Sequence, residues 1–386
     1  MNTETLKNTF QDCNINLLIG AGLSCPFLPT LGNLETFLTQ LEGRSGLSDD
    51  ARALVRASLY KKYFDTVIRK NLSILRHEPE PMEVRHSYRA MLTAANLVLL
   101  KRKTTILSKE VNLFTTNVDI FLDQSLEDLG LEFNDGFSGR FTPRFGLGNF
   151  QKTHFAKSSH YGNTAELPTF NLFKLHGSIS WSEGHDAVRF SQDLAHIEAL
   201  CPLSDALVQA LSVPNDATLE SLITEAGATV PDASTRSFVA EYERRLLLVN
   251  PTKDKFRSTL LNQTYYEMLR VYSNSLEREN TFLLAMGFSF ADEHIRDITL
   301  RAAASNPTLL VCVVAYNAQS EAELKARLGT SPHNNVKIIA PPRDAHDEDC
   351  FVYDLSTINA RLFGSMLAAI DGMRESTAGD PTTTTP

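Results

Sequence analysis

The sequence predicts an α/β fold in which a mostly parallel β-sheet is covered by helices on both faces. Short, continuous apolar segments recur along the chain, and most are followed by a turn residue and then by a helical pattern. Such strands are typical of a sheet that is buried on both faces, whereas half-exposed antiparallel strands alternate in polarity. The 386 residues suffice for one large α/β domain with a helical module, or for two modest domains.

The expected strands are rich in β-branched and other apolar residues and end at Gly, Asn or His. Ligands of parallel sheets bind at the carboxyl ends of the strands, so the residues directly after these segments should converge on one crevice. The segments are Ile15–Ile19, Val111–Phe114, Phe170–Leu175, Leu246–Val249, Phe282–Ala285, Leu309–Ala315 and Val336–Ile339.

Two long intervals, 49–108 and 184–240, show helical rather than strand patterns. We interpret them as helical insertions that form a cap or second lobe within an α/β domain spanning residues 1–375. The interval 134–165 is rich in Gly, Phe and Ser, which favours a loop over the site. The low-complexity tail 376–386 is expected to be disordered.

Composition excludes several classes of function. A formal net charge of −9 disfavours a broadly basic, nucleic-acid-binding surface. The start of the chain lacks the order of a secretion signal, and no apolar run approaches the roughly 20 residues that span a bilayer. A cytoplasmic location is therefore expected. No C-x-x-C pair is present, so neither a four-cysteine zinc site nor a disulfide framework is expected from Cys13, Cys25, Cys201, Cys312 and Cys350.

The first apolar segment ends in a glycine-rich turn, Gly20-Ala21-Gly22-Leu23-Ser24. Glycine lets the backbone approach a phosphate closely, and a helix after the turn would direct free N–H groups at the anion. The same turn also occurs as a purely structural connection. It lacks the third glycine of a dinucleotide fingerprint, and the acids that follow, Glu35 and Glu42, lie in a helical pattern. A hydride-transferring dehydrogenase is therefore disfavoured.

Asn117 follows the second apolar segment and is flanked by Thr116 and Asp119. Thr, Asn and Asp are preferred N-cap residues, so this turn can simply begin the apolar helix that starts near Phe121. A ligand-binding role is compatible with that interpretation, because ligands bind where helices begin at the carboxyl ends of strands. Both roles stay open for Asn117.

His176 follows the third apolar segment and precedes Gly177. A single histidine after a strand is commonly a hydrogen-bonded structural residue. The glycine beside it indicates close approach of another group, which favours a functional role. His176 is therefore a candidate for proton transfer as well as for structure.

Two later turns have the same form. Gly287 and Ser289 follow a predicted strand and precede Asp292, which lies at an N-cap-like position before an apolar helix. Asn317 follows the Leu309–Ala315 segment. Each turn is a candidate for ligand contact, and each is also compatible with an ordinary strand–turn–helix connection.

In this order, the segments resemble the sirtuin (silent information regulator) family, and especially the bacterial sirtuin-like NAD hydrolases of antiphage defence. Each motif alone is weak, whereas the ordered set is specific, and it spans about residues 14–320. The matching segments are Gly20-Ala21-Gly22-x-Ser24 with Pro29, Thr115-Thr116-Asn117-Val118-Asp119, Lys174-Leu175-His176-Gly177-Ser178, Pro251-Thr252-Lys253 and Gly287-Phe288-Ser289-Phe290-x-Asp292.

The resemblance implies a Rossmann-like domain that binds NAD as its substrate. His176 would be the base or the group that orients the ribose. The pyrophosphate would contact Gly20, Ala21, Gly22 and Ser24, the nicotinamide ribose Thr116, Asn117 and Asp119, and the adenosine half Gly287, Ser289 and Asn317.

The chain departs from the deacylating sirtuins in two respects. Leu28 stands where that family commonly has glycine before Pro29, and the zinc-binding cysteine pairs are missing. The helical insertions would replace the zinc lobe, so no metal is expected and an acyl-lysine groove is disfavoured.

The resemblance therefore favours an NADase that releases nicotinamide and ADP-ribose, with Asn117 and His176 as catalytic residues. A non-catalytic NAD or ADP-ribose sensor is the main alternative, and an NAD-dependent protein deacylase is a further one. An unrestrained NADase would harm its host. Control by homo-oligomerisation or by a partner is therefore expected, and the resemblance suggests a HerA-type hexameric ATPase as one such partner.

Overall fold

The computed structural model describes residues 3–30, 32–102, 106–184, 188–227, 229–248, 259–329, 333–344, 346 and 348–369. The Pro251-Thr252-Lys253 motif and the tail 376–386 lie outside these residues.

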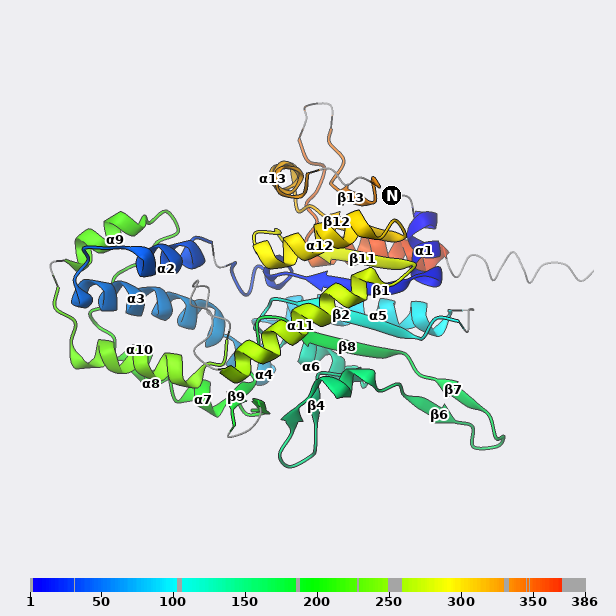
Figure 1. The fold of residues 1–386 in the computed structure, drawn as a ribbon, viewed down its shortest axis with the longest axis horizontal. Coiled ribbons are helices and arrows are strands. Elements are labelled where there is room, and N and C mark those ends of the chain that lie inside the picture. Colours follow the sequence, from blue (N-terminus) through cyan, green and yellow to red (C-terminus); the bar gives the residue numbers. More distant parts are fainter. Residues whose placement is uncertain are drawn as a thin grey trace, which may run out of the picture.

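A seven-stranded sheet forms the centre of the molecule, and all of its neighbouring strands are parallel (Figure 1). With helices on both faces, this confirms the predicted Rossmann-like fold class. The strands, in their order across the sheet, are β13 (Val336–Ile339), β12 (Leu309–Val314), β11 (Thr281–Met286), β1 (Asn14–Ile19), β2 (Glu110–Thr115), β8 (Thr169–Lys174) and β3 (Glu132–Asn134).

The central strands are continuously apolar because both of their faces are buried. Successive side chains of a strand point to opposite faces of its sheet. In β1, Leu17 and Ile19 belong to one hydrophobic core, whereas Leu18 belongs to the core on the other face. All three side chains are fully buried. Neither face is left for polar residues, except where they pair with one another.

Four asparagines on neighbouring strands form such pairs across the middle of the sheet. The Nδ2 of Asn112 donates to the Oδ1 of Asn16 at 2.9 Å, and the Nδ2 of Asn171 donates to the Oδ1 of Asn112 at 3.0 Å. Asn134 continues the row, because its Nδ2 donates to Asn171 at 2.8 Å. These residues, hereafter the asparagine ladder, are directly opposite one another in the register of β1, β2, β8 and β3.

One predicted strand does not form. In the Leu246–Val249 segment, Leu248 makes only an isolated antiparallel bridge to Gly177. Leu246, Leu247 and Leu248 are nevertheless buried against the two cores. A short apolar run thus marks burial but does not distinguish a strand from a buried connection. Conversely, the short strand β3 was missed, because it offers only three residues of weakly apolar character.

Each face of the sheet is covered by its own set of helices (Figure 1). The core on one face includes side chains from α1 (Thr3–Asp12), α5 (Met82–Leu100), α6 (Phe121–Asp128) and α14 (Leu355–Ile358). The core on the other face includes side chains from α11 (Thr259–Glu277), α12 (Glu293–Ser305) and α13 (Ala318–Leu328). Helix α5, from the interval 49–108, therefore helps to cover the sheet.

A helical lobe extends beyond one end of the sheet, at the left of Figure 1. Helix α3 is its centre and packs against α2, α9 and α10. The α4 helix (Asn71–Leu75) follows a π-helical turn at Phe64–Ile68 and leads back to the sheet. The lobe helices are α2 (Leu34–Gly43), α3 (Asp49–Tyr63), α7 (Ala195–Glu198), α8 (Cys201–Asp205), α9 (Leu219–Ala226) and α10 (Ala233–Arg245).

The interval 134–165, predicted as a loop over the site, contains short strands. Strands β6 and β7 form a hairpin that projects away from the central sheet (Figure 1), and β4 and β5 join an antiparallel four-stranded sheet. The strands concerned are β4 (Phe137–Ser138), β5 (Arg144–Phe145), β6 (Phe155–Lys157), β7 (Thr164–Glu166), β9 (Trp181–Glu183) and β10 (Val188–Phe190).

Within the described ranges, no helix combines the length and apolarity needed to cross a membrane.

Candidate functional site

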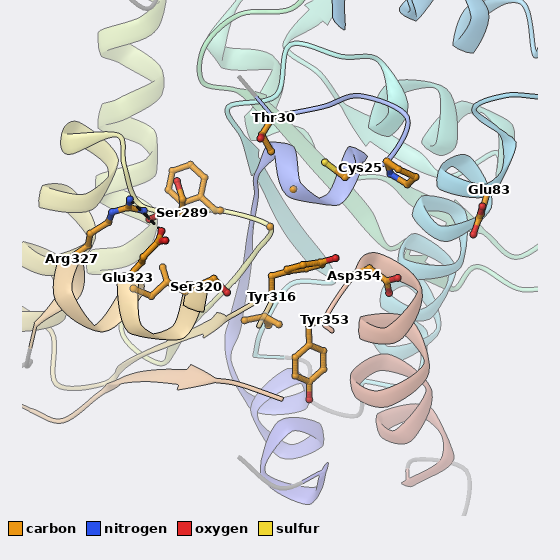
Figure 2. A pocket seen from close by; sticks show the side chains of 16 residues that line it. Cys25, Thr30, Glu83, Ser289, Tyr316, Ser320, Glu323, Arg327, Tyr353 and Asp354 are labelled. Atoms are coloured by element: carbon orange, nitrogen blue, oxygen red, sulfur yellow. Dashed lines mark hydrogen bonds and ion pairs between the residues drawn. The ribbon is translucent and has the colours of Figure 1, made fainter. Parts of the chain in front are cut away.

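A cavity of about 660 Å³ lies at the switch point of the sheet, where ligands of such folds bind. The chain adds strands to one side of β1 and then crosses over to place β11 on its other side. Loops after β1, β11 and β12 form the walls (Figure 2). The lining residues are Gly22, Cys25, Pro26, Thr30, Glu83, Gly287, Phe288, Ser289, Val314, Tyr316, Ser320, Glu323, Leu324, Arg327, Tyr353 and Asp354.

The predicted glycines bring the loop after β1 and the loop after β11 into backbone contact. A Cβ atom on Gly20 would lie 2.3 Å from the carbonyl oxygen of Gly287. Gly22 N donates to that same oxygen at 3.0 Å. Gly287 has a φ of +60°, and a Cβ there would lie 2.6 Å from the Leu23 nitrogen. The packing of the two loops therefore requires glycine at positions 20 and 287, whereas a Cβ on Gly22 would be tight at 3.0 Å from the Gly287 carbonyl oxygen; Gly22 and Gly287 also line the cavity.

Asn117 lies at the end of β2 and is joined to the glycine-rich turn. Its Nδ2 donates to the Gly20 carbonyl at 3.2 Å and to Ser24 Oγ at 3.4 Å. Because a carbonyl can only accept, the amide nitrogen must face Gly20, and Oδ1 must face the other way. That oxygen is buried and accepts no hydrogen bond from the described part of the chain. A buried acceptor of this kind calls for a water or a ligand.

The N-cap role considered for Asn117 is not observed. Helix α6 begins at Phe121 after Ile120, without a side-chain cap from Asn117. Instead, Asp119 Oδ1 accepts from the Phe121 nitrogen at 3.1 Å. Asp119 therefore bonds at the start of α6, whereas the Asn117 side chain is directed to the glycine-rich turn.

Asp119 is also the centre of a buried hydrogen-bond group. Its Oδ2 accepts from Ser24 Oγ at 2.9 Å, and the same hydroxyl lies 3.0 Å from the Tyr88 hydroxyl. Burial raises the pKa of Asp119, and the positive charge of Lys174 opposes that rise. Burial also raises the pKa of Tyr88 well above its usual value, so this phenol stays protonated. Tyr88 was missed in the sequence because it lies within a long amphipathic helix.

Lys174, at the end of β8, contacts the turn that follows β2. Its buried Nζ lies 2.7 Å from Asp123 Oδ2 and donates to the Asp119 carbonyl oxygen. Asp135, on the loop after β3, has its pKa raised to about 6, mainly by burial and with a contribution from the charge of Asp123. The chain therefore buries one ammonium group among several carboxyls, which holds the turns after β2 and β8 together.

His176 pairs with Asp292 at the start of helix α12. The Nε2 of His176 lies 3.0 Å from Asp292 Oδ2. Asp292 is held in place because its Oδ1 accepts from the His294 and Ile295 nitrogens, at 2.9 and 3.1 Å. Nε2 forms no hydrogen bond with the described residues, so its contact with Asp292 becomes an ion pair only when the ring is protonated. The pair is largely enclosed, with 20% of the His176 side chain and 12% of the Asp292 side chain exposed.

Gly177 has a structural explanation that does not involve a ligand. Its φ is +80°, and a Cβ there would lie 2.7 Å from the Leu247 carbonyl oxygen. The close approach inferred from the sequence is therefore made by the 246–248 segment. Glycine at this position gives no support to a functional role for His176, which depends on the Asp292 pair instead.

The remaining predicted residues divide between the cavity and its surroundings. Ser289 lines the cavity, and its carbonyl oxygen accepts from Arg327 at 2.7 Å. Asn317 does not line it. Its side chain accepts from the Ser320 nitrogen at 2.9 Å as the N-cap of α13. Ala21 and Thr116 are half-buried and lie outside the cavity lining. Ser24, Asn117, Asp119 and His176 do not line this cavity either.

Most of the cavity's charged and aromatic residues were not predicted. Figure 2 shows Cys25 and Thr30 of the first loop on one side and Tyr316, after β12, on the other. Tyr353 and Asp354 arrive from the C-terminal segment, and the Tyr353 nitrogen donates to the Tyr316 carbonyl at 2.9 Å. No local pattern marks these residues, because only the fold brings the C-terminal segment to the switch point.

No set of three or more His, Cys, Asp or Glu side chains that could hold a metal ion was found among the residues described.

No family model and no curated protein matches this chain. A solved structure reported as a structural basis for the mechanism and regulation of Sir2 enzymes aligns with 96% of this chain and 98% of its own. The identity is 11% and the TM-score is 0.37. At those values the alignment supports no inference about function, and the chemistry of the site rests on its own residues.

Proposed function

We propose that this protein hydrolyses NAD at the bond between nicotinamide and ribose, which gives nicotinamide and ADP-ribose. The observation that carries the proposal is the buried amide of Asn117, whose donor side faces Gly20 and whose Oδ1 accepts no hydrogen bond from the described residues. Such an acceptor, at the carboxyl end of β2 and beside a glycine-rich turn, suits a ribose hydroxyl or an attacking water.

The cavity supports the adenosine half of this assignment. Its carboxylates, on Glu83, Glu323 and Asp354, are acceptors of the kind that bind ribose hydroxyls in dinucleotide sites. Tyr316 is 51% exposed and offers a ring on which a base could stack. The cavity's volume of about 660 Å³ lies within the usual range for ligand pockets.

The proposed reaction needs little covalent chemistry from the protein. The bond between the anomeric carbon and the pyridinium nitrogen breaks, and its electron pair goes to the nitrogen, so nicotinamide leaves as a neutral molecule. Positive charge develops on the ribose, and the oxygen of water bonds to the anomeric carbon. Asn117 would position the water or the ribose hydroxyl through Oδ1, which corresponds to catalysis by orientation.

His176 would accept the proton that the water or a ribose hydroxyl loses. Either ring nitrogen is a candidate base, and the Asp292 carboxylate, 3.0 Å from Nε2, would stabilise the imidazolium ion that forms. General base catalysis of this kind contributes typically about 10²–10⁴-fold. Asp292 is then a positioning residue whose own alignment comes from the start of α12.

The test is nicotinamide release from NAD by the full chain, measured alone and then with the products of neighbouring genes. We expect Asn117→Ala and His176→Ala each to lose at least about 100-fold in rate. Asn163→Ala, on the exposed hairpin, is the matched control and should retain the activity of the unaltered chain. Undiminished release by both site variants would overturn the assignment.

A second candidate function, a non-catalytic sensor of NAD or ADP-ribose, is favoured by one observation. Neither Asn117 nor His176 lines the described cavity, so a nucleotide could occupy it without meeting either side chain. Calorimetry with ADP-ribose would separate the two functions. Tight binding without nicotinamide release under any activating condition would favour the sensor.

We further propose that the activity is restrained until assembly or a partner releases it, as suits an NAD-depleting effector in antiphage defence. A homo-oligomer or a HerA-type hexameric ATPase are the candidate partners, and the helical lobe offers surface for either. Light scattering coupled to NAD turnover would test the restraint. A monomer that hydrolyses NAD constitutively would contradict it.

A further inference from the structure

A second cavity of about 490 Å³ lies in the helical lobe, on the other side of the first loop from the switch-point cavity. We name it the lobe cavity. It is formed where the start of α2, the end of α3 and the loop before α9 meet. Its lining residues are Pro29, Thr30, Gly32, Asn33, Leu34, Phe37, Lys62, Thr66, Val67, Val213, Pro214 and Asn215.

The two cavities differ in charge. The switch-point cavity is lined by Glu83, Glu323 and Asp354 and by one cation, Arg327. Among the described side chains that line it, the lobe cavity has one cation, Lys62, and no carboxylate. A ligand with a negative charge is therefore favoured at Lys62 in the lobe cavity.

Lys62 is half-buried and, over the described ranges, forms no ion pair. The neighbouring lysine, by contrast, forms an ion pair: Lys61 Nζ lies 2.8 Å from Asp65 Oδ2. A partly desolvated ammonium group without a counter-ion gains more from an incoming anion than a fully hydrated one does. Lys62 thus supplies the charged end of a binding site.

The rest of the lobe cavity fits a ring attached to that anion. Leu34, Phe37 and Val67 supply apolar and aromatic surface, and the exposed amides of Asn33 and Asn215 supply polar groups beside it. A ring can pack on the apolar side chains while polar groups contact its substituents.

We propose that the lobe cavity binds a small aromatic molecule that carries a phosphate or a carboxylate, with the anion at Lys62. The first loop connects this site to the switch point, since Thr30 lines both cavities. A ligand in the lobe cavity therefore contacts the segment that forms a wall of the other. The proposal does not depend on NAD hydrolysis and can be tested without it.

Calorimetry of the full chain with phenyl phosphate, benzoate and neutral benzamide tests the proposal. We expect the two anions to bind and benzamide to bind at least about tenfold more weakly. The phosphate and carboxylate arms show which anion the site prefers. Equal binding of benzamide, or no binding of either anion, would overturn the proposal.

Variants locate the binding. Lys62→Gln should weaken both anions at least about tenfold, and Asn33→Ala, at an exposed position, should weaken them about threefold. Lys157→Gln, on the projecting hairpin, is the matched control for charge and should change nothing. Glu323→Gln alters the switch-point cavity and should leave anion binding intact. Binding that survives Lys62→Gln, or that changes only with Glu323→Gln, would contradict the assignment to the lobe cavity.

Discussion

Buried asparagines occur in two regions of the same sheet and are treated differently. Across the middle of the sheet, the side chains of the asparagine ladder bond to one another from strand to strand, at 2.8–3.0 Å. At the carboxyl end of β2, Asn117 is joined to the glycine-rich turn through its nitrogen alone. The ladder amides bond to one another and hold the register of the strands, whereas the Oδ1 of Asn117 stays available as an acceptor for a water or a ligand.

Burial of an amide does not by itself mark a functional site. Both regions are enclosed, and both involve residues on neighbouring parallel strands. The two regions differ in which hydrogen-bond donors and acceptors have partners. Substitution in the ladder should therefore reduce stability alone, whereas substitution at Asn117 should reduce activity as well, because its nitrogen also bonds to the glycine-rich turn.

The largest expected effect on stability is at the loop contact that positions Asn117. Gly20→Ala would place a methyl group 2.3 Å from the Gly287 carbonyl, between two backbone segments that cannot both move aside. We expect a loss of about 3 kcal/mol or more in the free energy of unfolding. Urea denaturation measures it.

Gly43→Ala is the matched control, because a Cβ at Gly43 would meet nothing within 4 Å. It should be neutral or stabilise by a few tenths to about 1 kcal/mol. Equal stability of the two variants would show that the contact between the loops after β1 and β11 is not required.

The next effect concerns Asp135, which directly follows the last ladder residue and is influenced by Asp123 and Lys174 of the site. Burial raises its pKa from 3.8 to about 6. The folded chain therefore holds this proton more tightly than the unfolded chain does. The resulting stability is fully present below pH 3.8 and is lost as the pH rises through about 6.

Over that range the loss is at most about 3 kcal/mol, at 1.36 kcal/mol for each pKa unit. Asp135→Asn should abolish this part of the pH dependence, and urea denaturation between pH 4 and 7 measures it. Asp297→Asn is the control, since 70% of the Asp297 side chain is exposed. An unchanged pH profile in Asp135→Asn would contradict the burial effect.

A smaller effect is expected within the ladder. Asn112→Leu would leave the Oδ1 of Asn16 and the Nδ2 of Asn171 without their present partners. We expect a loss of about 2 kcal/mol in the free energy of unfolding. Nicotinamide release per folded molecule should be unchanged, whereas Asn117→Ala should lose release per folded molecule. Loss of activity in Asn112→Leu at full stability would remove the distinction between the two regions.

Some features of the fold and the site could be predicted because local sequence encodes them. Continuous apolar runs identified six strands of the central sheet, since burial on both faces leaves no place for polar alternation. Gly20, Gly22 and Gly287 were recognised because close backbone approach excludes a Cβ atom. The sequence did not say what approaches them, and the partner is the other loop.

Other features depend on contacts between distant segments. Leu246–Val249 has the composition of a strand, but of its described residues only Leu248 forms a bridge, to Gly177. Asn16 and Asn112 are unremarkable in sequence, and only the parallel register places them opposite each other. Tyr353 and Asp354 line the cavity although about 330 residues separate them from the first loop.

The sequence alone therefore determined the α/β class, the strand ends that carry polar residues and the positions where glycine is needed, because periodicity and backbone freedom are local properties. Which hydrogen-bond donors and acceptors have partners depends on the tertiary structure. The tertiary contacts distinguish Asn117 from the ladder, make Asn317 a helix cap and place His176 beside Asp292. Hydrogen bonding between distant segments depends on where the chain returns, and no local pattern records it.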